Sequence, residues 1–288
     1  MHDDPLTTLR DLVDLQRYAL DEPDSPAWRD AVARVRADLE RDGCSVLADF
    51  IAAARRPQLE AECAALESQA HFPPASVNAY NIDAAGLPPD HPAHIAFERG
   101  NAFVARDQIP PEHLIQRLYV NEIFQRFLAD CFGAAELHVL ADPFAGLCVN
   151  VLPPGHEHPW HFDINEFTVS LLTRPAQSGG AFTYHPWLRS PENENAAAVA
   201  AILRNESASA GKSLQLRCGD LQLFCGRYAL HRVNAVGGEY ARHTAIFAYS
   251  RIPGVIGGKE RTQQLFGRLS AAHIAAADKS RRSDQLLD

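Results

Sequence analysis

The sequence predicts an α+β fold in which a helical N-terminal part precedes a sandwich or small barrel of short strands. Two observations support this prediction. Residues 1–70 are rich in Ala, Leu, Arg and Glu, and their apolar positions recur at helical spacing. From about residue 137 the pattern changes to short apolar runs separated by Gly, Pro, Asn and Asp. Several such runs without intervening helices are typical of a sandwich or a barrel.

The N-terminal part is expected to contain two helical segments with a loop between them. Val32, Val35 and Leu39 recur at helical spacing in the first segment, and residues 112–133 return to a helical pattern. Between these segments, residues 71–111 are repeatedly interrupted by proline. A long proline-rich stretch predicts a loop, which would form a lid or a wall over a site.

The second half is expected to supply the strands. Gly237-Gly238 is typical of a hairpin turn before the last strand. Residues 191–210 are expected to contain a short helix, and residues 259–279 are expected to form a C-terminal helix. The expected strands are Leu137–Leu140, Ala145–Leu152, Phe162–Thr173, Ala181–Tyr184, Ser213–Arg217, Leu221–Phe224 and Thr244–Ser250.

The 288 residues are expected to form one domain. Hydrophobic residues make up 46% of the chain and charged residues 22%, which is enough for a sizeable core. The expected parts are a helical part at 1–136 with its loop at 71–111, a strand core at 137–256, and a C-terminal helix within 257–288.

Charge and cysteine usage exclude several classes of partner. The net charge is −9 and no long basic block occurs, so we expect no nucleic-acid partner. The six cysteines are scattered without a CxxC pair, which favours free thiols in a reducing cytoplasm. The N-terminus has no signal layout and no apolar run reaches membrane-spanning length, so we expect a cytoplasmic protein without a membrane partner. A homodimer stays open.

Three residues have the pattern of a metal centre. His161 and Asp163 lie two residues apart at the end of an expected strand, so their side chains face the same side. His231, after the expected strand at 221–224, would supply the third ligand. Two imidazoles and one carboxylate suit an Fe(II) ion that keeps one face open. An HxD pattern alone is common by chance, so this prediction depends on the later residues as well.

A second metal arrangement uses other histidines. His156 and His158 with His161 and the acid Asp163 have the spacing seen in cupins. Against this arrangement, the prolines and the glycine within residues 153–159 predict a turn rather than a strand. We therefore expect an exposed His156, and we expect His158 to lie in the wall of a pocket.

Arg242 and Thr244 are candidates for binding a keto-acid cosubstrate. An arginine binds a carboxylate through two parallel hydrogen bonds, and a hydroxyl two residues further on lies on the same face of a strand. This pair suits the distal carboxylate of 2-oxoglutarate, although an ordinary strand-edge arginine has the same pattern. Arg227, in a turn before His231, is a second candidate for holding the cosubstrate or the site loop.

These residues resemble the Fe(II)/2-oxoglutarate oxygenases, whose core is a double-stranded β-helix, a jelly-roll or cupin-like barrel. The family pattern is HxD/E, a distal His and Arg-x-Ser/Thr, which this chain matches at His161, Asp163, His231, Arg242 and Thr244. Across residues 144–254, the segments NVLPPGHEHPWHFDINEFTVSLL, GGAFTYHP and GDLQLFCGRYALHRV resemble the branch that contains free-amino-acid radical halogenases and their hydroxylase relatives. The resemblance implies Fe(II) as the metal, with 2-oxoglutarate and O2 as cosubstrates.

One departure from the halogenases of this branch matters. In those enzymes a small residue replaces the metal-binding acid and leaves a coordination site for chloride, whereas this chain has Asp163. The resemblance therefore implies hydroxylation of an aliphatic C–H of a small substrate, a free amino acid or a derivative, with succinate and CO2 as coproducts. Desaturation and ring closure stay open.

Substrate contacts are expected near the ligand strand. His158, Trp160 and Asn165 flank it, and Asn150 lies on the preceding strand, although Trp160 and Asn150 also suit plain packing roles. The polar loop candidates are Asn78, Tyr80, Asn81 and Arg99. The acidic net charge favours a cationic or zwitterionic substrate. Two alternatives remain: a cupin-type metal-dependent dioxygenase or isomerase without 2-oxoglutarate, and a non-enzymatic ligand-binding barrel.

Overall fold

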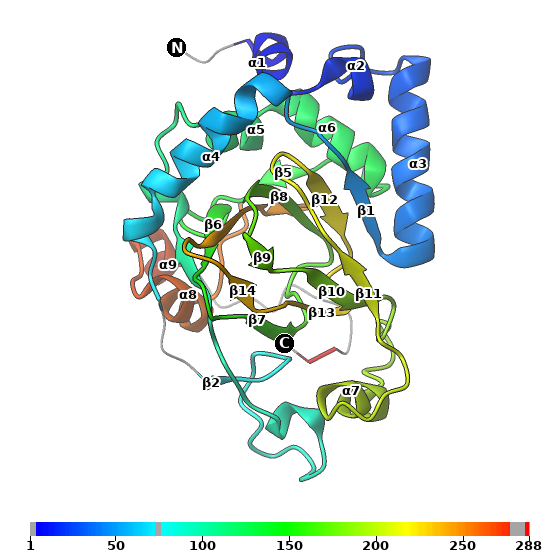
Figure 1. Ribbon diagram of the computed structural model, residues 1–288, viewed down its shortest axis with the longest axis vertical. Coiled ribbons are helices and arrows are strands. Elements are labelled where there is room, and N and C mark those ends of the chain that lie inside the picture. Colours follow the sequence, from blue (N-terminus) through cyan, green and yellow to red (C-terminus); the bar gives the residue numbers. More distant parts are fainter. Residues whose placement is uncertain (1–3, 73–75, 277–285, 288) are drawn as a thin grey trace.

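Two antiparallel sheets face each other and form the centre of the molecule (Figure 1). The computed structural model describes residues 4–72, 76–276 and 286–287. In this part of the chain the larger sheet has the strand order β1-β12-β8-β15-β6-β4 and the smaller sheet has the order β11-β10-β13-β7. Two facing sheets of this kind form a double-stranded β-helix, so the predicted α+β class and barrel core are confirmed.

The strands of the larger sheet are β1 (Cys44–Leu47), β4 (Ala102–Val104), β6 (Leu147–Leu152), β8 (Thr168–Arg174), β12 (Leu221–Phe224) and β15 (Arg242–Phe247). Those of the smaller sheet are β7 (His158–His161), β10 (Phe182–His185), β11 (Lys212–Leu214) and β13 (Leu230–Val233). Short pairs form outside the two sheets: β2 (Ser76–Val77) with β3 (Phe97–Glu98), β5 (His138–Val139) with β16 (Tyr249–Ser250), and β9 (Ser178–Gly179) with β14 (Val236–Gly237).

Helices cover the outer face of the larger sheet. They are α1 (Pro5–Leu12), α2 (Leu15–Tyr18), α3 (Pro26–Asp42), α4 (Arg56–Ala65), α5 (Leu114–Tyr119) and α6 (Glu122–Cys131), and Figure 1 shows them arched around one side of the barrel. Trp28 of α3 meets Phe127 of α6 edge-on with ring centroids 5.2 Å apart, and Phe124 of α6 meets Phe247 of β15 at 6.2 Å. These rings belong to one apolar core shared by helices and sheet.

The larger sheet separates this core from a pocket because its side chains alternate between the two faces. Val149 and Ala245 lie in the core, whereas their neighbours Asn150 and Thr244 line the pocket between the sheets. Asn150 and Thr244 are direct partners in the β6–β15 register. The strand register therefore presents polar side chains side by side inside the barrel.

The remaining elements lie around the ends of the barrel. They are α7 (Ala196–Leu203), α8 (Lys259–Phe266) and α9 (Ala271–Ala275), with 3₁₀ turns η1 (Ala53–Arg55), η2 (Glu67–Gln69), η3 (Pro92–His94) and η4 (Arg106–Gln108). The short helix predicted within 191–210 is confirmed by α7. The predicted C-terminal helix at 259–279 is instead two short helices, because α8 ends at Gly267 in the left-handed region; residues 277–279 lie outside the described residues.

Four details of the predicted strand pattern were wrong. Two strands, β1 and β4, come from the parts predicted to be helix and loop, because pairing with distant strands outweighs their local composition. The turn predicted at 153–159 ends earlier, since β7 begins at His158; β7 is an edge strand, where Pro159 is tolerated. The strand predicted from Phe162 begins only at Thr168.

The fourth detail is the hairpin at Gly237-Gly238. Strand β14 pairs with β9, whereas β15 pairs with β6 and β8 in the larger sheet. The chain thus passes from the short β9–β14 pair to the larger sheet at this turn, which a local turn pattern does not reveal. No helix in the described ranges is long and apolar enough to span a bilayer.

Candidate metal centre

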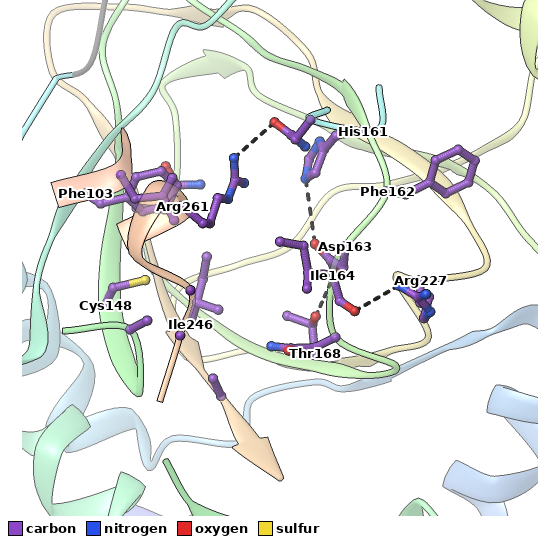
Figure 2. Close-up of a pocket in the computed structure, with 18 of the residues that line it drawn as sticks. Phe103, Cys148, His161, Phe162, Asp163, Ile164, Thr168, Arg227, Ile246 and Arg261 are labelled. Atoms are coloured by element: carbon purple, nitrogen blue, oxygen red, sulfur yellow. Dashed lines mark hydrogen bonds and ion pairs between the residues drawn. The ribbon is translucent and has the colours of Figure 1, made fainter. Parts of the chain in front are cut away.

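Three side chains converge where β7 and β13 run side by side. His161 lies directly opposite His231 in the antiparallel register, and Asp163 follows two residues after His161. Asp163 Oδ1 is 3.8 Å from Nε2 of His161 and 3.5 Å from Nε2 of His231. One potential ligand atom of each residue lies within 4.8 Å of those of the other two. Figure 2 shows His161 and Asp163 pointing toward each other in the pocket. The structure thus brings together the three predicted ligands.

Both imidazoles are oriented in the same way. His161 Nδ1 donates to the carbonyl of Pro159 at 2.8 Å, and His231 Nδ1 donates to the carbonyl of Ala229 at 2.9 Å. Because a carbonyl only accepts, each bond fixes the tautomer that leaves Nε2 unprotonated. Two Nε2 lone pairs therefore face Asp163, ready for a metal ion.

Asp163 is held by two further contacts. Its Oδ2 accepts a 2.6 Å hydrogen bond from Thr168 Oγ1, and its backbone N–H donates to the Gly226 carbonyl at 3.1 Å. A Cβ atom at position 226 would overlap the Asp163 carboxylate. Glycine at this position is thus required by the close approach of the ligand.

The charge states suit a divalent cation. Burial and repulsion from His231 lower the pKa of His161 to about 3, so this imidazole is neutral at neutral pH. Burial acts to raise the pKa of Asp163, but His231 and Thr168 outweigh it and hold the pKa below its usual range. Neutral imidazoles and an ionised carboxylate are the forms that bind metal.

A β-bulge adds a third histidine to this face. His231 pairs with His161, but Val233 pairs with His158, so β7 has one residue more than β13 between these pairs. His158 therefore faces the pocket like His161, and the two rings stack with centroids 4.0 Å apart. Regular alternation would have placed these two side chains on opposite faces.

Trp160 directly precedes His161 on β7, so its side chain lies on the opposite face, away from the pocket. Its ring lies under the Arg232 guanidinium at 4.6 Å and 5.5 Å from the His185 ring, within a separate apolar cluster. Of the predicted substrate contacts, the structure brings His158, Asn150 and Asn165 to the pocket, but not Trp160.

Arg242 and Thr244 lie together on β15, facing the pocket. Arg242 Nη1 donates to Thr244 Oγ1 at 2.6 Å, and only 5% of Arg242 is exposed. Burial lowers its pKa to about 10, so the guanidinium stays charged at neutral pH. No carboxylate of the described residues forms an ion pair with it. A buried charge without a counter-ion is costly, so this position favours an anionic ligand.

Arg227, the second candidate, supports the ligand loop. It is almost completely buried, and its Nη1 donates to the carbonyl of Ile164 at 3.1 Å (Figure 2). Ile164 follows Asp163, so this contact fixes the chain next to the ligand. It agrees with the second of the two roles considered for Arg227, which is holding the site loop.

The cupin-type arrangement is not assembled. His156 is exposed, as expected; its Nδ1 donates to the Pro154 carbonyl at 3.1 Å, and its ring meets the ring of Phe72 at 5.8 Å. In the described residues the group suited to a metal is His161, Asp163 and His231.

The pocket has a volume of about 1620 Å³ and extends beyond the two sheets. Of the predicted loop candidates, Asn78, Asn81 and Arg99 line it, whereas Tyr80 packs against Phe162 with ring centroids 5.5 Å apart. Sequence reasoning missed Thr168, Gly226 and Arg261. The first two have a weak signal, since they lie close to ligand residues in the chain; no spacing pattern marks Arg261.

Comparison with solved structures supports the same architecture. The non-heme alpha ketoglutarate dependent carbocyclase SnoK from nogalamycin biosynthesis is 17% identical, with 75% of this chain and 82% of that chain covered and a TM-score of 0.53. The corresponding epimerase SnoN is 15% identical, with 77% and 83% covered and a TM-score of 0.51. AviO1 from Streptomyces viridochromogenes Tue57 is 14% identical, with 76% and 94% covered and a TM-score of 0.51. The fold is a double-stranded β-helix. No protein-family model and no curated protein sequence matches the chain.

Proposed function

We propose that the chain is an Fe(II)- and 2-oxoglutarate-dependent dioxygenase that hydroxylates an aliphatic C–H group of a small substrate, a free amino acid or a derivative. One observation carries the proposal. The triad of His161, Asp163 and His231 shares its pocket with the buried cation Arg242, which no carboxylate of the described residues pairs with. Metal ligands beside an anion site suit a metal enzyme that uses an acidic cosubstrate.

The ligand set fits Fe(II). Nε2 of His161, Nε2 of His231 and a carboxylate oxygen of Asp163 would hold the ion and leave one face open. Bound Fe(II), with O2 and the keto acid, supplies the oxidising chemistry and releases succinate and CO2. Because Asp163 would take a coordination position, no site would be left for a halide, and hydroxylation is the expected outcome.

The protein's own residues would bind and orient the cosubstrate and the substrate. Arg242 and Thr244 would receive the distal carboxylate of 2-oxoglutarate, which directs its keto-acid end toward the triad. Phe103, Cys148 and Ile246 form an apolar wall of the pocket that excludes water from the reaction (Figure 2). Burial holds the pKa of His158 well below its usual value, so this residue would meet the substrate as a neutral hydrogen-bonding group.

The test is an anaerobic titration of the Fe(II)-loaded protein with 2-oxoglutarate, followed through the visible metal-to-ligand charge-transfer band. We expect a saturable band in the wild type and no band in His161→Ala. In Arg242→Gln the band should reach saturation only at a far higher concentration of 2-oxoglutarate. His156→Ala, an exposed histidine on the same chain segment, is the matched control and should keep the wild-type band. If folded, iron-loaded protein gives no band, the proposal is wrong.

A further inference from the structure

Besides Arg242, a pair of cations lies in the pocket. Arg99 follows β3 and Arg261 lies on α8, and both line the pocket. Arg99 Nη2 and Arg261 Nη1 donate to one shared atom, Asn81 Oδ1, at 3.1 and 3.2 Å. Only 7% of Arg99 is exposed, and its Nη1 has no hydrogen-bond partner among the described residues.

Among the described residues, these two guanidiniums have no counter-ion. In the described part of the chain neither Arg99 nor Arg261 forms an ion pair with a carboxylate. Burial lowers the pKa of Arg261 to about 9, and the charge of Arg99 contributes to the shift, although part of the Arg261 side chain remains accessible to solvent. Asn81 offers both cations a neutral oxygen, which does not balance two like charges. An acidic protein of net charge −9 thus keeps two cations together inside its pocket, and no carboxylate of the described ranges pairs with them.

The pair shares the pocket with the metal ligands, because Arg99, Arg261, His161 and Asp163 all line it. The loop that carries Asn81 lies against the ligand segment, since the Phe162 N–H donates to the Ala79 carbonyl at 2.8 Å. Figure 2 shows Arg261 in the same pocket as the ligands His161 and Asp163. A molecule bound by the two arginines would therefore lie in the same pocket as the residues that would hold the metal.

Both arginines lie on segments that are packed against the rest of the fold. A Cβ atom at Gly100 would overlap the backbone of Glu157, so the chain after Arg99 lies directly against the segment that leads into β7. Helix α8 is anchored by Phe266, whose ring lies 5.8 Å from Phe144. The chain before α8 is held as well, because the Gly257 N–H donates to Asp142 Oδ2 at 2.7 Å. The segments that carry Arg99 and Arg261 are thus held in place without a ligand.

We infer that Arg99 and Arg261 bind an anionic group of the substrate, a carboxylate or a phosphoryl group, and hold it beside the metal centre. This inference rests on the proposed function and adds the substrate class. One oxyanion between the two guanidinium forks would supply the missing counter-charge and accept charge-assisted hydrogen bonds from both. For a free amino acid, the bound group is its carboxylate. The cosubstrate would keep its own arginine, Arg242, so the pocket has two separate anion sites.

The test uses the protein loaded with Fe(II) and saturating 2-oxoglutarate without oxygen, so that Arg242 is already occupied. The probes are acetate, inorganic phosphate and the free amino acids, each amino acid beside its carboxamide, at constant ionic strength. We expect an anionic probe to perturb the charge-transfer band, and carboxamides to have no effect. Arg99→Gln and Arg261→Gln should each weaken this probe roughly tenfold or more, without changing the affinity for 2-oxoglutarate. A response to phosphate but not to carboxylates would indicate a phosphorylated substrate.

Arg251→Gln is the matched control, because Arg251 also lines the pocket but is partly exposed and already pairs with Glu166 at 3.4 Å. It should bind the probes as the wild type does.

Two further variants test the role of the Arg99 charge. Ligand-free Arg99→Gln should have a melting temperature no lower than that of the wild type, since it loses the repulsion between Arg99 and Arg261. Arg99→Lys should keep part of the anion binding.

Three results would overturn the inference: carboxamides that bind as well as acids, anion binding unchanged in both glutamine variants, or no anion response in protein that shows the band. Absence of the band itself would instead refute the proposed function.

Discussion

Two parts of the pocket are built by different means. In the strand-built part, β7 and β13 of the smaller sheet present His161 and His231, and β15 of the facing larger sheet presents Arg242, so strand register sets the spacing within each sheet. In the other part, the substrate side, a segment with little regular structure and helix α8 present Arg99 and Arg261, and side-chain hydrogen bonds hold them. The part that would perform the chemistry thus depends on the sheets, whereas the part that would recognise the substrate depends on attachments to them.

This difference has a consequence for substitutions. Within the strand-built part, a change that displaces a ligand on β7 or β13 should affect metal binding and therefore turnover, and a change of Arg242 on β15 should affect cosubstrate binding. A change in an anchor of the substrate side should affect the substrate alone. The following predictions test this separation, beginning with the largest expected effect.

The largest effect is expected for Gly226→Ala. The added Cβ would overlap the carboxylate of Asp163, so either this ligand or the chain carrying it has to move. Displacing a ligand should cost at least the roughly 10–100-fold in metal affinity known for changes to groups that orient ligands. Fe(II) affinity, measured by competition with a chelator, and turnover of 2-oxoglutarate should fall together.

Gly258→Ala is the control for this change. No atom lies within 4 Å of a Cβ built at Gly258, and its φ of −68° suits any residue. This variant should bind Fe(II) as the wild type does. Equal metal affinity in both glycine variants would show that Asp163 is not held by close packing against Gly226.

The same difference explains what could be predicted from the sequence. His161, Asp163 and His231 follow from a period of two and from recurring residue types, and the structure brings them together as expected. Arg261 had no such signal, because its place in the pocket depends on how α8 docks, more than 90 residues after Asp163 in the chain. A local pattern encodes the face of a strand, but not the docking of a distant helix.

Strand β7 illustrates a second limit. Alternation of side chains along a strand correctly places Phe162 on the face opposite to His161 and Asp163. It fails between His158 and His161, where the bulge inserts an extra residue and both side chains face the pocket. Such an irregularity depends on pairing with β13, so it is invisible in the sequence of β7 alone. The strands β1 and β4 were missed for a related reason, since each is specified by its partner strand.

An intermediate effect, confined to the substrate side, is expected for Asp142→Asn. The buried Asp142 carboxylate accepts hydrogen bonds from the Gly257 N–H and from His273 Nε2, at 2.7 and 3.1 Å, and thereby ties the chain around α8 to the barrel. An amide offers one acceptor instead of two. We expect a loss of about 1–3 kcal/mol in unfolding free energy and weaker binding of anionic substrates, with an unchanged 2-oxoglutarate titration.

The pH dependence of this variant follows from the carboxylate. Burial acts to raise the pKa of Asp142, but backbone N–H groups outweigh it and lower the pKa below its usual value. Its stabilising contribution is therefore present above the unfolded-state pKa of about 3.9 and is lost as the pH falls through the lower folded-state pKa. Urea unfolding should show the largest gap between wild type and variant at neutral pH, and a gap that shrinks in acid. A gap independent of pH would contradict this role for Asp142.

The smallest effect on activity is expected for Trp160→Phe. Trp160 was predicted as a substrate contact, but it is the neighbour of His161 on β7, so it faces Arg232 and points away from the pocket. Phe is a weaker cation–π partner than Trp, so the variant should lose at most about 0.5–1 kcal/mol of unfolding free energy from this contact. The value of kcat/KM for the amino acid that perturbs the charge-transfer band should stay within about twofold of wild type. His158→Gln, on the pocket-facing side of the same strand, should lower kcat/KM instead. If Trp160→Phe reduced kcat/KM without a change in stability, Trp160 would contact the substrate, and the assignment of the two faces of β7 would be wrong.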